Sequence, residues 1–257
     1  MLKSPMVSIK NLSVRQAKNS RDILNQINLD IFPEEVVGLI GLSGCGKSTL
    51  AKTLVGLTSI TEGEIEFGNQ ILVSKKTKYE SKFRKEVQIV FQDPSACLNP
   101  RMSVLSILLE PLQIHESHLS KVEKILIACE MLEEVGLGRE YLKRYPHELS
   151  GGQKQRVCIA RSLILKPKFL IFDEAVSALD ASIQAQILNL LRKLKKDFGF
   201  TLLFISHDLP IIHYISDKIA VMVDGRIVEF GTPHEIFNHA KHPFTRRLID
   251  LSKKYVN

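Results

Sequence analysis

The 257-residue sequence lacks any apolar run of the roughly eighteen residues that a membrane-spanning helix needs. Its longest apolar runs, Val36–Leu42 and Thr201–Ile205, have the length of strands and contain or adjoin polar residues. The first residues also lack a basic region followed by an apolar stretch and a small-residue cleavage site, which is the pattern of an export signal. We therefore expect a cytoplasmic protein that does not itself cross a membrane.

Cysteine is scarce, and the four cysteines, Cys45, Cys97, Cys129 and Cys158, lie far apart in the sequence. The spacing of the four cysteines argues against a zinc knuckle and against a secreted disulfide framework, so reduced thiols are expected.

Lys and Arg outnumber Asp and Glu by 35 to 28, a balance that suits binding to nucleic acid or to an anionic membrane face. The excess is too scattered to choose between them.

Hydrophobic periodicity predicts an α/β fold. Apolar residues alternate in the first third of the chain, which indicates strands at Val7–Val14, at Ile27–Ile31 and around Ile65 and Phe67. A helical pattern covers Ser120–Val135. Later, strand patterns alternate with a helical one, as in a parallel sheet; these strands are 169–172, 201–205 and 219–223, and the helix is 181–198.

These patterns predict one domain over residues 1–257. Residues 1–93 and 163–257 form its α/β core, and residues 94–162 form an inserted helical subdomain.

A phosphate-binding loop is the strongest local motif. The sequence from Gly41 to Ser48 matches G-x-x-x-x-G-K-[ST], after an apolar strand pattern and before a helical one. Glycines let successive N–H groups face a phosphate, and the following helix directs its positive dipole end there. Lys47 is expected to reach the β- and γ-phosphates and Ser48 to ligate magnesium; a glycine-rich turn without a ligand is the weaker alternative. The predicted nucleotide contacts here are Gly41, Ser43, Gly44, Cys45, Gly46, Lys47, Ser48 and Thr49.

A second motif supplies two acids at the end of a buried-strand pattern, Lys168–Phe172. Asp173 is expected to hold magnesium, through water, and Glu174 to accept a proton from the attacking water or to orient it. Such a pair could instead cap the next helix. The P-loop in the same chain favours the catalytic interpretation.

The segment Leu149–Gln153, with the sequence LSGGQ, is a second candidate anion site, since a serine hydroxyl and glycine N–H groups begin a helical pattern. An ordinary serine N-cap explains Ser150 but not the Gly-Gly-Gln that follows. The segment resembles the signature of the ABC ATPase family. The resemblance implies a P-loop ABC ATPase fold, with a RecA-like parallel-sheet core, an antiparallel β subdomain and an inserted α-helical subdomain.

The resemblance also implies a role for each further motif. Gln92 matches the Q-loop, which senses magnesium and the γ-phosphate while touching the permease, and His207 matches the switch histidine, which contacts the γ-phosphate. Asp180 lies in the D-loop that crosses the dimer interface. Each is weak alone, but their order is that of the family. The implied catalytic residues are Glu174, His207 and Gln92, the magnesium ligands are Ser48, Gln92 and Asp173, and Ser150, Gly151, Gly152 and Gln153 meet the ATP of the opposite subunit.

Two segments, 91–102 and 242–248, resemble the ATPases of oligopeptide, dipeptide and nickel importers. The resemblance implies an ATPase that uses ATP and Mg²⁺ to drive uptake of peptides or nickel through two separate permease subunits. It implies a second ATPase subunit, identical or related, and an extracytoplasmic solute-binding protein. The expected location is the cytoplasmic face of the bacterial inner membrane, where the protein is peripheral.

The chain departs from the family pattern in three places. No aromatic residue is evident for stacking on adenine, so Arg15 is a candidate instead. Ala175 and Val176 stand where Pro-Thr is common. A cysteine-rich tail is missing, so no iron–sulfur cluster is expected. The histidines of the C-terminal segment are interpreted as structural or regulatory rather than as a nickel site; they are His234, His239 and His242.

A rival interpretation is an ABC ATPase without a permease that acts on nucleic acid or ribosomes, which the basic charge mildly supports. Such proteins generally carry two ATPase units or a long coiled coil, and this sequence has one unit and no sustained heptads. We therefore expect no nucleic-acid partner. A non-catalytic regulatory subunit is a third possibility, against which the intact Glu174 and His207 argue.

Overall fold

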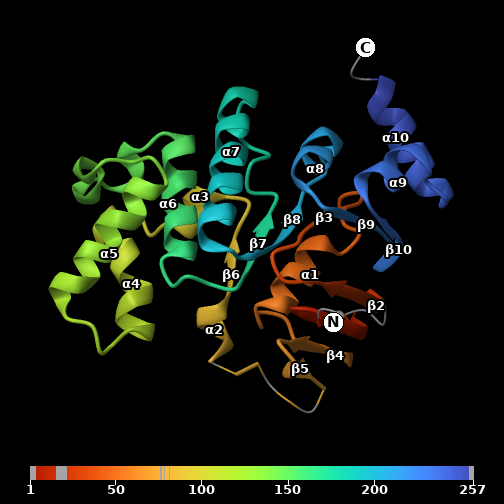
Figure 1. The fold of residues 1–257 in the computed structure, drawn as a ribbon, viewed down its shortest axis with the longest axis horizontal. Coiled ribbons are helices and arrows are strands. Elements are labelled where there is room, and N and C mark those ends of the chain that lie inside the picture. The colour runs from red at the N-terminus through yellow and green to blue at the C-terminus, as the bar shows by residue number, and fades with distance from the viewer. Residues whose placement is uncertain (1–3, 16–21, 76, 78, 81, 255–257) are drawn as a thin grey trace. The chain divides into compact units, whose positions relative to one another are not determined.

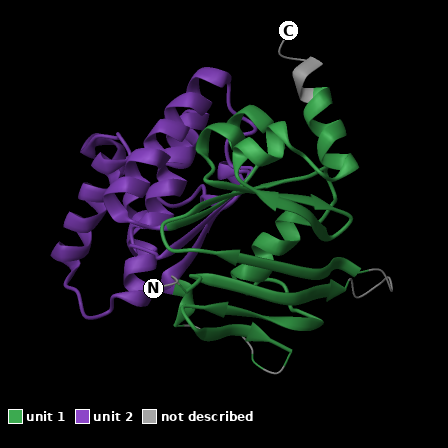
Figure 2. Cartoon of the chain, turned by 45° about the vertical axis from the view of Figure 1, so that its right-hand side comes forward, with its two compact units in different colours: residues 1–84, 201–257 green, residues 85–200 purple. Residues whose placement is uncertain are grey.

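The computed structural model describes residues 4–15, 22–75, 77, 79–80 and 82–254. The chain forms two compact units, one made of residues 1–84 and 201–257 and the other of residues 85–200 (Figure 2). Helices and strands occur in both units (Figure 2).

The first unit contains an antiparallel four-stranded sheet in the order β2-β1-β4-β5 (Figure 1). Its inward face is apolar, and Ile9, Ile27 and Ile65 are at most 1% exposed. Gly68 and Asn69 both have positive φ in the two-residue turn between β4 and β5, as a hairpin with a right-handed twist requires. The strands are β1 (Val7–Arg15), β2 (Asp22–Ile31), β4 (Glu62–Phe67) and β5 (Gln70–Ser74).

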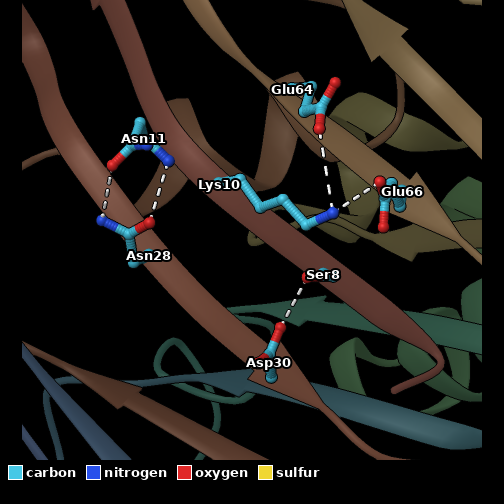
Figure 3. A network of polar contacts seen from close by, with 7 residues as sticks. All are labelled: Ser8, Lys10, Asn11, Asn28, Asp30, Glu64 and Glu66. Carbon is cyan, nitrogen blue, oxygen red and sulfur yellow. Dashed lines mark hydrogen bonds and ion pairs between the residues drawn. The ribbon is translucent and has the colours of Figure 1, made fainter. Parts of the chain in front are cut away.

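Polar side chains pair across this sheet (Figure 3). Lys10 Nζ lies 2.6 Å from Glu66 Oε1, and Ser8 Oγ donates to Asp30 Oδ1 at 2.6 Å. Asn28 accepts from the backbone N–H of Asn11 at 2.9 Å. Contacts of this kind contribute little stability each when they are exposed, but they fix which strand faces which.

The same unit holds a mixed sheet segment around β3 (Val36–Ile40), whose five residues are all buried. β3 runs parallel to β8 (Thr201–Ile205) on one side and to β9 (Lys218–Val223) on the other, and β10 (Arg226–Gly231) is antiparallel to β9. Parallel strands buried on both faces read as continuous apolar runs, as these do. The helices of this unit are α1 (Lys47–Leu54), α8 (Leu209–Ile215), α9 (Pro233–Asn238) and α10 (Pro243–Lys254).

The second unit contains two parallel strands, β6 (Val87–Val90) and β7 (Phe169–Asp173), and most of the helices. α5 begins at a capping box, in which Ser120 and Glu123 bond each other's backbone N–H, and it ends before Gly136 in a left-handed conformation. Its helices are α3 (Pro94–Cys97), α4 (Val104–His115), α5 (Lys121–Glu134), α6 (Gly151–Leu163) and α7 (Ala181–Phe198), with 3₁₀ turns η1 (Arg139–Lys143) and η2 (Pro146–Glu148); the short α2 (Phe83–Glu86) spans the division between the units.

The predicted fold class is confirmed, with an antiparallel sheet, parallel strands and a helical segment. The predicted strand 201–205 and helix 181–198 have the observed bounds. The compact unit 85–200 also contains β6, β7 and α7, which the sequence analysis assigned to the nucleotide-binding core. The boundaries 93/94 and 162/163 therefore remain a prediction. Among the described residues, no helix is long and apolar enough to span a bilayer.

A pair of leucines on α5 tests how the helical segment is held together. Leu132 is 0% exposed and Leu126 is 50% exposed. We expect Leu132→Ala to lower the free energy of unfolding by about 2–5 kcal/mol, because it leaves a cavity. Leu126→Ala should change it by less than about 0.5 kcal/mol. Urea unfolding followed by circular dichroism measures both, and equal losses would contradict this assignment of the core.

Candidate nucleotide site

The P-loop joins β3 to α1 with its backbone packed too closely for side chains at two positions. A Cβ on Gly41 would lie 2.3 Å from the carbonyl oxygen of Met222, and one on Gly46 would lie 2.9 Å from Leu24. Gly46 is also the N-cap of α1, with a φ of 112°. The loop can therefore bring its N–H groups around a phosphate at the helix N-terminus only with glycine at these positions.

Lys47 lies inside this loop. Its side chain is 4% exposed, and Nζ donates to the carbonyl oxygens of Gly41 at 2.9 Å and Leu42 at 3.2 Å. The ammonium group is thus held over the loop on which phosphate binding is predicted. Ser43 and Gly44 are exposed, and Ser48 and Thr49 are half-buried.

Cys45 is the cysteine of the loop, and its surroundings make its thiol unreactive. The residue is 7% exposed, and burial raises the pKa of its thiol, while the nearby charge of Lys47 acts in the opposite direction. A thiol whose pKa is raised carries little thiolate at neutral pH. We therefore assign Cys45 to packing beneath the loop.

The turn between β9 and β10 supports the P-loop from behind, which the sequence analysis missed. Gly225 donates its N–H to the Cys45 carbonyl at 2.9 Å, and its own carbonyl accepts from Asn25 at 2.8 Å. A Cβ on Gly225 would lie 2.4 Å from the Ile23 carbonyl oxygen. The only sequence signal was the Asp-Gly pair at 224–225, which is typical of a turn but does not indicate that the turn contacts the P-loop.

His207 lies at the same sheet edge as the P-loop. β3 and β8 are parallel neighbours with Leu39 opposite Ile205, so the residues that follow both strands emerge together. Ser206 Oγ accepts from the N–H of Asp208 at 3.0 Å, which shapes the turn, and His207 is exposed. The first unit thus brings the P-loop and His207, the predicted switch histidine, to one edge.

Arg15 has a partner of its own. Its Nε donates to Asp22 Oδ1 at 2.8 Å, and the guanidinium is about half exposed. Hydrogen bonding to Asp22 raises the pKa of Arg15, so the side chain stays cationic. Its contact with adenine remains a prediction, and the neighbouring Gln16 lies outside the described residues.

The second unit brings Gln92, Asp173 and Glu174 to one edge in the same way. β6 and β7 are parallel with Val90 opposite Phe172, so Gln92 and Glu174 both follow by two residues. Asp173 is 4% exposed, whereas Gln92 is exposed and Glu174 is half-buried. Buried strand ends carrying acids beside an amide are suited to holding a hydrated divalent cation.

Glu174 adopts a left-handed backbone conformation, with a φ of 48°. The N–H and the hydroxyl of Ser177 both donate to the Glu174 carbonyl, at 3.1 and 2.8 Å. These bonds hold a conformation that is rare outside glycine, and such conformations concentrate at functional sites. The N-cap of the following helix, α7, is Asp180, which accepts from Ile183 at 3.0 Å. Neither Asp173 nor Glu174 therefore caps that helix.

The LSGGQ segment forms the N-terminus of α6. Ser150 Oγ accepts from the N–H of Gln153 at 3.3 Å, and Gln153 Oε1 accepts from the N–H of Ser150 at 2.9 Å. This capping box fixes the first turn. A Cβ on Gly152 would lie 2.8 Å from Ile183, which explains glycine there, while one on Gly151 would meet Leu179 at an ordinary 3.5 Å.

These features define a P-loop nucleotide-binding protein that carries a second glycine-rich helix N-terminus. Comparison with known families agrees: residues 24–177 match the family described as ABC transporter. The chain belongs to the ABC transporter family.

The chain is also similar to peptide-transport proteins over most of its length. It is 44% identical to the oligopeptide transport ATP-binding protein OppF of Streptococcus mutans over 247 residues, covering 95% of this chain and 80% of that protein. It is 44% identical to the dipeptide transport ATP-binding protein DppF of Lactococcus lactis over 249 residues, with 95% and 80% covered. Among solved structures, a post-hydrolysis dimer of the ATP-binding cassette MJ0796 with ADP and Pi matches with a TM-score of 0.79 and 29% identity, over 89% of this chain and 99% of that one.

Two glycines of the P-loop provide a matched test of its packing. We expect Gly41→Ala to lower the free energy of unfolding by about 3 kcal/mol, because the new methyl group meets a backbone carbonyl that cannot move aside. Gly44 has open space around it and a φ of 81°, so Gly44→Ala should cost only about 1 kcal/mol of backbone strain. Denaturant unfolding without nucleotide compares the two. Equal losses would mean that the Met222 carbonyl does not restrict Gly41.

Proposed function

We propose that this chain is the ATP-hydrolysing subunit of an ABC importer that drives peptide uptake through a separate membrane permease. The observation that carries the proposal is the presence in one chain of a complete P-loop with a buried lysine and a second glycine-rich helix N-terminus at LSGGQ. Similarity to oligopeptide and dipeptide transport ATP-binding proteins over 95% of the chain supports peptides as the cargo.

Each side chain has a role that its chemistry supports. The backbone N–H groups from Ser43 to Thr49 and the ammonium of Lys47 bind the phosphates. Glu174 accepts a proton from the attacking water or orients it, while Gln92 and His207 contact the γ-phosphate side of the reaction. The roles require no covalent intermediate, because phosphoryl transfer to water needs positioning and charge stabilisation above all.

Magnesium fits the donors that these motifs supply. Ser48 offers a hydroxyl, Gln92 an amide oxygen and Asp173 a carboxylate, and Mg²⁺ prefers such oxygen ligands while keeping several waters. Asp173 is 4% exposed at the end of β7. Held by these residues, the ion would supply positive charge that offsets the negative charge of the bound ATP.

The LSGGQ segment acts in trans, on the ATP of a second ATPase subunit. Ser150 and Gly152 present a hydroxyl and an N–H at the start of α6, and Asp180 lies on the turn before α7. Two chains then close over two ATP molecules and reopen after hydrolysis, and this cycle moves the permease. The dimeric, ADP- and Pi-bound state of the similar cassette MJ0796 supports this arrangement.

The remaining partners follow from this role. Two permease subunits form the membrane path, an extracytoplasmic solute-binding protein delivers the cargo, and this chain works peripherally at the cytoplasmic face of the inner membrane. Nucleic acid has no part in the cycle. Within the chain, residues 1–93 and 163–257 serve nucleotide binding, and residues 94–162 carry the signature.

Glu174→Gln tests the catalytic assignment. The amide keeps the shape of the side chain but cannot accept a proton, so we expect ATP affinity to be retained and turnover to fall by about 10²–10⁴-fold. A dimer should accumulate with magnesium-ATP in size-exclusion chromatography. Glu133→Gln, an exposed acid paired with Arg139, is the control and should hydrolyse normally. Normal turnover without dimer gain in the Glu174 variant would refute the assignment.

Lys47→Ala tests phosphate binding and the cargo together. Loss of a charged donor should weaken ATP binding by roughly ten- to a hundredfold in calorimetry. Lys52→Ala, an exposed lysine on the same helix, should bind ATP normally. In source cells carrying Lys47→Ala, we expect uptake of a labelled peptide to be lost and uptake of labelled nickel to be unchanged. Loss of nickel uptake alone would contradict the proposed cargo, and unchanged ATP affinity would contradict the role of Lys47.

A further inference from the structure

Gln155 is a buried polar residue without a role in the site described above. Its side chain is 0% exposed, and neither Oε1 nor Nε2 finds a hydrogen-bond partner among the described residues. Most buried side-chain polar atoms in proteins are bonded, so an orphaned amide needs an explanation, and partners formed in another state of the protein are one. Glutamine both donates and accepts, so one amide can join two backbone segments.

The helix places Gln155 toward the loop that carries Gln92. Residues three and seven positions ahead on α6 share its face. Cys158 Sγ lies 3.9 Å from the carbonyl oxygen of Pro94, and Ser162 Oγ donates to the carbonyl of Ile89 at 3.2 Å. Lys154 Nζ, next to Gln155, lies 3.3 Å from Ser95 Oγ. α6 therefore runs alongside the segment from β6 into α3, and Gln92 lies within that segment.

The other flank of Gln155 faces the chain that follows Glu174. Gly152 is three positions before Gln155, and a Cβ there would lie 2.8 Å from Ile183 in the first turn of α7. Gly151 faces Leu179 in the same way, at 3.5 Å. On this helix face, Gln155 therefore lies between the segment that carries Gln92 and the segment that leads from Glu174 to α7.

We propose that Gln155 is a positioning residue for ATP hydrolysis, whose amide bridges the loop of Gln92 and the loop after Glu174 when nucleotide is bound. Because the amide donates from Nε2 and accepts at Oε1, it couples the start of the signature helix to both loops. The inference rests on the proposed ATPase function. It assigns Gln155 no contact with the reacting atoms, only control over the residues that make such contacts.

Gln155→Leu separates this role from a structural one. Leucine removes the orphaned amide at similar volume, so the thermal midpoint Tm without nucleotide should rise by about 3 °C. Turnover should nevertheless fall about tenfold or more, with the KM for ATP changed less than twofold, because misplaced catalytic groups lower kcat while phosphate binding stays intact. The assay uses the complex that copurifies with the tagged full-length chain; Gln155→Met replaces the leucine variant if that one does not fold.

Ser162→Ala is the matched control on the same face of α6. Its hydroxyl already has a partner, so its removal should lower Tm and leave kcat unchanged. Unchanged kcat in Gln155→Leu would overturn the inference while the proposed function stands. A fall in Tm would also overturn it, since the amide would then be bonded in every state, for example to buried water. Failure of the wild-type complex to hydrolyse ATP would instead count against the proposed function.

Discussion

The constraint on which the rest of the fold depends is that a loop whose backbone N–H groups face a phosphate must pass from strand to helix without a side chain at Gly41 and Gly46. Gly41 meets the Met222 carbonyl and Gly46 meets Leu24, so both neighbours are part of the loop's support. β3 must therefore be central, with β8 and β9 on either side. The turn after β9 completes the support through the hydrogen bond from Gly225 to Cys45.

Both candidate anion sites carry internal hydrogen bonds in this structure, but of opposite direction. Lys47 donates to two carbonyls of its own loop, and the Ser150 hydroxyl accepts from the N–H of Gln153. A phosphate at the P-loop would compete with the two hydrogen bonds that Lys47 already donates, so the net gain from that contact is smaller than its gross strength. The Ser150 hydroxyl only accepts in its bond with Gln153, so its own hydrogen is still available to donate. Exchange of hydrogen bonds at Lys47 keeps binding reversible, as a cycle of closing and reopening requires.

Local motifs in the sequence provide the predicted residues of the candidate site, whereas the residues that support them were found only from tertiary packing. The P-loop, the LSGGQ segment and the acid pair Asp173 and Glu174 are recognisable because their chemistry is set by residues adjacent in the chain. The strand 201–205 and helix 181–198 were predicted to the residue, because continuous apolar runs and helical periodicity are strong there.

The support beneath Gly41 and the burial of Gln155 left no such signal. Both depend on contacts between residues distant in sequence: Met222 is supplied by β9, and the surroundings of Gln155 by β6 and the start of α7. The C-terminal helices α9 and α10 were not predicted, since their short apolar patterns follow Pro233 and Pro243 without a long period. The periodicity of hydrophobic residues along the chain does not indicate which distant backbone segment will cover a given side chain.

The departure at Ala175 and Val176 shows how the same geometry is held by different means. A proline after Glu174 would restrict the turn covalently. Here Ala175 and Val176 are 2% and 1% exposed, and Ser177 donates twice to the Glu174 carbonyl. Packing and hydrogen bonding thus hold the left-handed Glu174, whose φ of 48° aims its side chain differently from an extended strand residue. Because a strained conformation persists only where its surroundings determine it, the burial of Ala175 and Val176 and the hydrogen bonds from Ser177 together keep the Glu174 backbone in this conformation at the end of β7.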